Sequence, residues 1–80
     1  MIGQKLEKIF LWNNKPGHDK FYDMYENDDG ETFTAYWGRS WTYGQSKTFS
    51  MSLWDVKLCD KLEKGYEEVN SSRGYYNRND

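Results

Sequence analysis

Alternation of apolar and polar residues predicts four β-strands in the first part of the chain. Large apolar side chains recur in short runs, and a Pro-Gly pair and an Asp-Gly pair mark turns between them. In the third run, Phe33, Ala35 and Trp37 fall on one face of the predicted strand. The short connections predict an antiparallel meander. The predicted strands span residues 5–12, 21–26, 32–38 and 46–49.

The apolar period changes from strand to helix at Ser50. The apolar positions that then follow at helical spacing are Met51, Trp54, Leu58 and Leu62. Ser50 and Ser52 both offer an N-cap, and we favour Ser50 because Phe49 and Trp54 would then form a hydrophobic staple. Gly65 predicts the end of the helix, since a residue in this position often adopts a left-handed conformation.

These elements predict a single α+β domain in residues 1–68, with an antiparallel sheet of about four strands packed against one helix. Eighty residues hold one small core, and aromatic residues, 19% of the chain, supply much of it. Residues 69–80 are rich in Asn, Ser and Gly and lack an apolar period, so we expect a disordered C-terminal tail.

Charge and reactive residues exclude several classes of function. The net charge of −2 argues against a general polyanion binder, so any nucleic-acid site must be local. With Cys59 as the one cysteine and His18 as the one histidine, neither an internal disulfide nor a closed zinc site of four Cys or His ligands can form. We expect Cys59 to be a small buried helix residue, and we expect no metal and no cofactor.

The N-terminal segment has only a four-residue apolar run, 9–12, before a polar loop. This run is too short for a signal peptide or a membrane span. We therefore expect a small, soluble, cytoplasmic protein that does not bind membranes and is a monomer.

Acidic residues are absent from residues 32–54, which carry Arg39 and Lys47 and a local charge of +2. The interval also holds eight Ser and Thr residues, and hydroxyl and basic groups commonly contact phosphate. The predicted helix start adds a partial positive charge. The aromatic residues able to stack on a base or sugar are Tyr36, Trp37, Trp41 and Tyr43. This pattern favours an anionic ligand with a flat face, although threonines and aromatics are also typical of an ordinary β-sheet.

The sequence Trp37-Gly38-Arg39 followed by Gly44-Gln45 resembles the signature of the WGR domain, which is known from DNA-dependent poly(ADP-ribose) polymerases and many bacterial proteins. Three more blocks match in order and spacing. They are Lys20-Phe21-Tyr22, Lys47-Thr48-Phe49 and Lys64-Gly65-Tyr66. The resemblance covers residues 5–68 and implies a curved antiparallel sheet packed on one helix. It also implies binding to DNA breaks.

Carried onto this chain, the resemblance makes Trp37, followed by Gly38, the residue that packs on the terminal sugar. It places Arg39 beside the DNA end, in contact with either the DNA or a partner domain. Gln45 and Lys47 become the expected contacts on the phosphate side.

The chain departs from the family in the loop after the arginine, where Ser40-Trp41 replaces the usual Val-Gly. Two roles for Trp41 remain open: an added stacking platform, or a cover for the sheet edge. Tyr43 lies in the same loop and belongs to the predicted nucleic-acid-binding surface.

We therefore expect a stand-alone, sequence-independent module that binds nucleic acid and favours DNA ends, nicks or junctions; RNA stays open as a ligand. The alternative is a protein-interaction module that uses the same exposed aromatic surface, since aromatics and arginine dominate interface energies. We expect no catalytic residues, because one histidine cannot build a triad and no Gly-rich phosphate loop precedes the helix.

Overall fold

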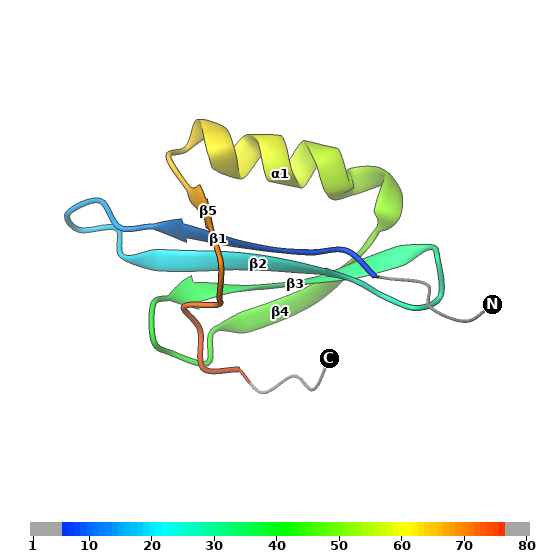
Figure 1. Ribbon diagram of the computed structural model, residues 1–80, viewed down its shortest axis with the longest axis horizontal. Coiled ribbons are helices and arrows are strands. Elements are labelled where there is room, and N and C mark those ends of the chain that lie inside the picture. Colours follow the sequence, from blue (N-terminus) through cyan, green and yellow to red (C-terminus); the bar gives the residue numbers. More distant parts are fainter. Residues whose placement is uncertain (1–5, 77–80) are drawn as a thin grey trace.

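The computed structural model describes residues 6–76, which form a five-stranded antiparallel sheet and one short α-helix (Figure 1). In chain order the elements are β1 (Lys8–Asn13), β2 (Lys20–Glu26), β3 (Thr32–Arg39), β4 (Gln45–Ser50), the 3-10 helix η1 (Met51–Leu53), α1 (Trp54–Glu63) and β5 (Glu67–Val69). The strand order across the sheet is β4-β3-β2-β1-β5. The predicted α+β class and the packing of the sheet on one helix are confirmed.

The core lies between the sheet and α1. Its buried members are Leu11, Tyr22, Met24, Phe33 and Ala35 from the sheet and Tyr66 from the turn after α1. From the helix, Trp54 and Leu58 pack against them, and the Trp54 ring meets the Phe33 ring edge-on at 5.2 Å between centroids. Each large apolar side chain buried in this way contributes about 1.5–3 kcal/mol, so a few aromatic residues suffice for a core of this size.

The helical segment starts as the sequence indicates. The Ser50 hydroxyl accepts a hydrogen bond from the backbone N–H of Ser52 at 3.3 Å and caps the 3-10 turn, whereas the N-cap position of α1 itself is Leu53, which has no side-chain cap. The α-helical part begins at Trp54, and Glu63 ends it two residues before Gly65.

Two predictions about the helix are wrong: Leu62 is 47% exposed and Cys59 is exposed. The reason is geometric. At about 100° per residue, a spacing of exactly four residues drifts around the helix, so Leu62 lies about 80° from Trp54. Lys61 occupies the angle nearer the sheet instead, and Cys59 faces outward.

The second face of the sheet is covered by residues that we expected to form a tail. The hydroxyls of Ser72 and Tyr76 donate hydrogen bonds to the buried carboxylate of Asp23. The Tyr76 ring stacks on Tyr36 with centroids 4.1 Å apart and planes at 9°. In Figure 1 this segment runs from β5 across the strands toward the β3–β4 turn.

The predicted tail, 69–80, is therefore corrected for residues 69–76, while residues 77–80 lie outside the described part of the chain. Val69 belongs to β5, which pairs with β1, and the residues after it pack on the sheet without regular secondary structure. A segment of this kind has no apolar period, which is why the composition alone suggests disorder.

Candidate nucleic-acid interface

Trp37 lies on the helix side of the sheet near the end of β3. In the strand register it stands opposite Tyr22 of β2 and Gln45 of β4. The Trp37 and Tyr22 rings stack, with centroids 6.0 Å apart and planes at 25°. This support fixes the indole in place, and because Trp37 is only half-buried, part of the ring remains accessible.

A cleft of 710 Å³ opens beside Trp37, where the C-terminal end of α1 approaches β2 and β3. The positive charges and aromatic rings that line the cleft on the helix side come from Lys20, Tyr22, Trp37, Arg39, Lys61 and Tyr66. A second hollow of 190 Å³ shares Tyr22, Trp37 and Lys61 with the cleft and extends toward Phe49 and Lys57. The two hollows thus meet at Trp37.

Lysines surround the aromatic floor of this region. The Lys61 ammonium lies 4.6 Å from the Tyr22 ring centroid and 5.6 Å from that of Tyr66, and the Lys57 ammonium lies 4.6 Å from Phe49. Cations over ring faces are attracted by the ring quadrupole. Partial burial lowers the pKa of Lys61, and the nearby charge of Lys64 lowers it further. An anion bound in the cleft would act in the opposite direction and favour the charged form of Lys61.

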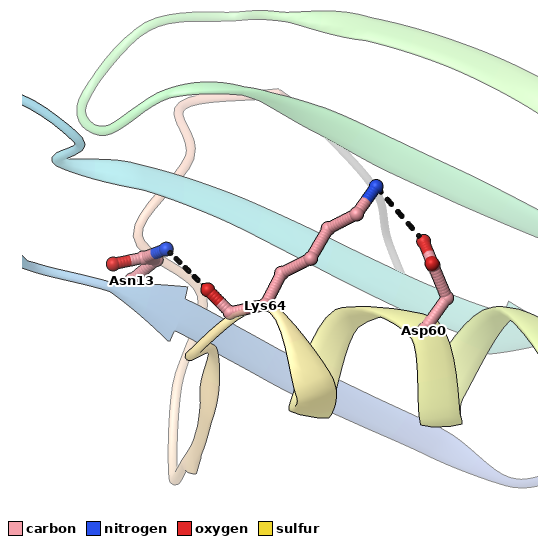
Figure 2. Close-up of polar contacts among 3 residues, drawn as sticks. All are labelled: Asn13, Asp60 and Lys64. Carbon is pink, nitrogen blue, oxygen red and sulfur yellow. Dashed lines mark hydrogen bonds and ion pairs between the residues drawn. The ribbon is translucent and has the colours of Figure 1, made fainter.

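Two carboxylates belong to the walls of these hollows: Asp19 lines the cleft, and Asp60 lines the second hollow. Asp60 forms an ion pair with Lys64, with an N–O distance of 3.2 Å (Figure 2). Asp19 accepts a hydrogen bond from the Trp12 indole N–H at 2.8 Å, and hydrogen bonds from Ser40 and then Trp12 lower its pKa. The ion pair offsets the charge of Asp60, whereas Asp19 has neutral donors only and keeps its negative charge in the cleft wall.

The end of α1 is fastened to the sheet next to the cleft. The buried Asn13 side chain of β1 donates a hydrogen bond to the Lys64 carbonyl at 3.4 Å (Figure 2). This contact satisfies a carbonyl that the helix end leaves without an intrahelical partner. It also fixes the turn that places Tyr66 in the cleft wall.

Five of the seven predicted site residues share the helix side of the sheet. Trp37, Gly38 and Arg39 line the cleft. Gln45 is the cross-strand partner of Trp37, and Lys47 is that of Ala35, so both point to the same side and both are exposed.

Trp41 and Tyr43 lie elsewhere, in the β3–β4 loop. The Trp41 N–H donates to the Arg73 carbonyl at 2.6 Å, and its ring lies 5.7 Å from that of Tyr75. Trp41 therefore contacts the C-terminal segment and does not line the Trp37 cleft. Tyr43 is 74% exposed.

Sequence reasoning missed Lys20, Lys57 and Lys61 as site residues. Lys57 and Lys61 are four residues apart, a spacing that places them on one side of α1, but the sequence pattern does not show whether that side faces solvent or a cleft. Lys20 belongs to a block that served only to support the family resemblance.

Together, the fold and the site define a small α+β domain with a cationic, aromatic-lined cleft at one end of its sheet. No protein-family model matches the chain, and no curated protein or solved structure shows significant similarity to it. Among residues 6–76, no helix is long and apolar enough to cross a bilayer. Within the same residues, no cluster of three His, Cys, Asp or Glu side chains is arranged to hold a metal ion.

Proposed function

We propose that the chain is a stand-alone, WGR-like module that binds nucleic acid without sequence preference and favours DNA ends, nicks or junctions. The observation that carries this proposal is the cleft itself. It joins a half-buried, ring-supported tryptophan, Trp37, to the positive charges of Lys20, Arg39 and Lys61.

The ligand must offer a flat face beside phosphate groups. A base or sugar at a strand end or junction offers such a face, whereas bases inside an intact duplex are covered by their neighbours. Trp37 supplies the stacking surface, and the lysines supply phosphate contacts. Rings and ammonium groups recognise shape and charge, which accounts for binding without sequence preference.

The distribution of charge favours one orientation on DNA. The acidic residues Asp28, Asp29 and Glu31 lie in or beside the β2–β3 turn, at the opposite end of the sheet from the cleft (Figure 1). A negative end repelled by phosphate and a positive end attracted to it would steer the cleft toward the DNA. The net charge of −2 would at the same time limit coating of intact duplex.

A protein-interaction module is the second candidate function. It is favoured by the exposed rings of Trp41, Tyr43 and Tyr75, which lie outside the cleft. In this case the aromatic surface would bind a partner protein, and DNA would not compete for it.

The test is an NMR titration at low salt with three DNAs of equal length: a blunt 5′-phosphorylated duplex, a duplex closed by hairpins at both ends, and a single strand. We expect the blunt duplex to bind more tightly than the closed one, with shifts at Trp37, Arg39, Gln45 and Lys47. With two or three phosphates neutralised, the log–log salt slope should be about −2 to −3. Equal binding to both duplexes would refute the preference for ends, and no binding would refute the function.

Matched charge variants locate the interface. Lys61→Met should weaken binding and make the salt slope shallower by about 0.9, the value expected for one lost phosphate contact. Lys8→Met removes the same charge from an exposed position at the far end of β1 and should leave binding unchanged. If the two variants behave alike, the cleft is not the binding site.

A further inference from the structure

Three large aromatic side chains are exposed where the β3–β4 loop meets the C-terminal segment. Trp41 is 49% exposed, Tyr43 is 74% exposed and Tyr75 is 58% exposed. An exposed group of aromatic rings on a small domain commonly marks a binding surface. We call these three residues the loop aromatic cluster.

The backbone holds this cluster in a defined position. The Trp41 N–H donates to the Arg73 carbonyl at 2.6 Å, and the Tyr75 N–H donates to the Thr42 carbonyl at 2.8 Å. Trp41 has φ 65°, a left-handed conformation that bulky residues rarely adopt. Two hydrogen bonds across the loop thus keep an unusual conformation that presents the indole next to Tyr75.

A positive charge lies within the cluster. The Arg73 guanidinium is 4.6 Å from the Trp12 ring centroid and 6.0 Å from that of Trp41. Arg39, which lines the cleft, stands at the start of the same loop, and residues 32–54 contain no acid. The loop that joins cleft and cluster therefore carries no acid of its own, and the carboxylate beside it is that of Asp19, which lines the cleft and accepts a hydrogen bond from Trp12.

The two sites are also adjacent in the fold. The β1–β2 turn, the β3–β4 turn and the end of α1 all lie at one end of the sheet (Figure 1). The cleft opens on the helix side of this end, and the cluster follows on the side covered by the C-terminal segment. A strand that leaves the cleft past Arg39 would meet Trp41 next.

We propose that the loop aromatic cluster and Arg73 bind the single-stranded extension of a DNA end, so that the substrate is a duplex with an overhang and not a blunt duplex. This inference rests on the function proposed above. Unpaired bases have free faces that stack on aromatic side chains whatever their sequence, and each stacked base adds roughly tenfold in affinity. Arg39 and Arg73 favour a polyanion over an apolar protein segment as the occupant.

The experiment compares two 5′-phosphorylated DNAs with the same duplex, one blunt and one with a four-nucleotide single-stranded overhang, by fluorescence anisotropy with the full chain. A third DNA with hairpin-closed ends reports on binding without an end. We expect the overhang DNA to bind about ten times more tightly than the blunt DNA, the gain for one stacked base. This ratio is the quantity that the variants change.

Two variants remove rings without disturbing the core. Trp41→Gly suits the positive φ of this position, and Tyr75→Ser removes a mostly exposed ring. Each should reduce the ratio to near one. Leu62→Ala, which shortens an exposed apolar side chain on the outward side of α1, should leave it near ten.

The outcomes separate the two proposals. A ratio near one in the native chain, with blunt DNA still preferred over closed DNA, overturns the overhang site and leaves the end-binding function standing. A native ratio of ten that both variants keep also overturns the inference, because the rings then contribute nothing. If none of the three DNAs binds, the proposed function fails and the inference fails with it.

Discussion

Gly44 offers a direct test of how the β3–β4 loop packs on the sheet. Its φ is +67°, and a Cβ at this position would meet the Trp37 carbonyl oxygen and, at 3.0 Å, the Cζ atom of Phe21. Gly30 in the β2–β3 turn has nearly the same backbone, with φ +72°, but a Cβ added there would have no other atom within 4 Å. Gly44→Ala and Gly30→Ala therefore differ mainly in the close contact.

The expected losses in unfolding free energy have two sources, the positive φ and the close contact. A left-handed conformation costs a non-glycine residue roughly 1–2 kcal/mol, which both variants lose. Overpacking adds about 1–3 kcal/mol at Gly44 alone, because the obstacle there includes rigid backbone. Gly44→Ala should thus lose about 2–5 kcal/mol. A domain of this size has a free energy of unfolding of only about 4–12 kcal/mol.

Urea denaturation followed by far-UV circular dichroism measures both free energies of unfolding under one condition. Gly30→Ala should shift the midpoint modestly, and Gly44→Ala should shift it about 1.5 to 4 times as far, with the same dependence on urea concentration. Equal shifts would show that the loop does not approach the β3 backbone as described. The position of Trp41 relative to the cleft would then need to be revised as well.

Four further predictions follow from the same structure. Burial raises the pKa of Asp23 above its ordinary value of 3.8. The protonated Asp23 carboxyl therefore stabilises the fold fully below about pH 4, and this stabilisation is lost as pH rises through the raised pKa. Asp23→Asn, whose amide oxygen still accepts hydrogen bonds, should gain stability relative to the native chain as pH increases, measured by urea denaturation from pH 4 to 7. Tyr76→Phe should cost about 1–3 kcal/mol in the same assay, because a buried acceptor loses a donor. Trp54→Ala should lower the free energy of unfolding by about 2–4 kcal/mol, since α1 loses its main contact with the core. Cys59 is exposed, so a thiol reagent should label the folded chain stoichiometrically without denaturant.

The sequence predicts the central strands well because their large apolar residues alternate. Phe33 and Ala35 fall on the core side as the pattern requires. It does not predict β5, because Glu67–Val69 is short, is mostly charged, and is held by backbone pairing with β1 at the sheet edge. A three-residue edge strand carries no periodic signal.

The sequence likewise predicts some residues of the candidate site and misses others. Trp37 and Arg39 emerge from the acid-free interval and the family resemblance, both of which are local in sequence. Lys57 and Lys61 do not, because a lysine on a helix has the same pattern whether it faces solvent or a cleft. The difference depends on how α1 lies across β2 and β3, which only the packed structure fixes.

The cover on the second face of the sheet has a consequence for the newly made chain. Asp23 is joined to Ser72 and Tyr76 by hydrogen bonds that span 49 and 53 residues, whereas neighbouring central strands are joined by short turns. Because closing a long loop costs entropy, we expect contacts so distant in sequence to form after the hairpins. Until residue 76 has left the ribosome, the Phe21 and Tyr36 rings lack the tyrosine that stacks on both. We therefore expect this aromatic face of the sheet to stay open to solvent until the C-terminal segment has packed on it.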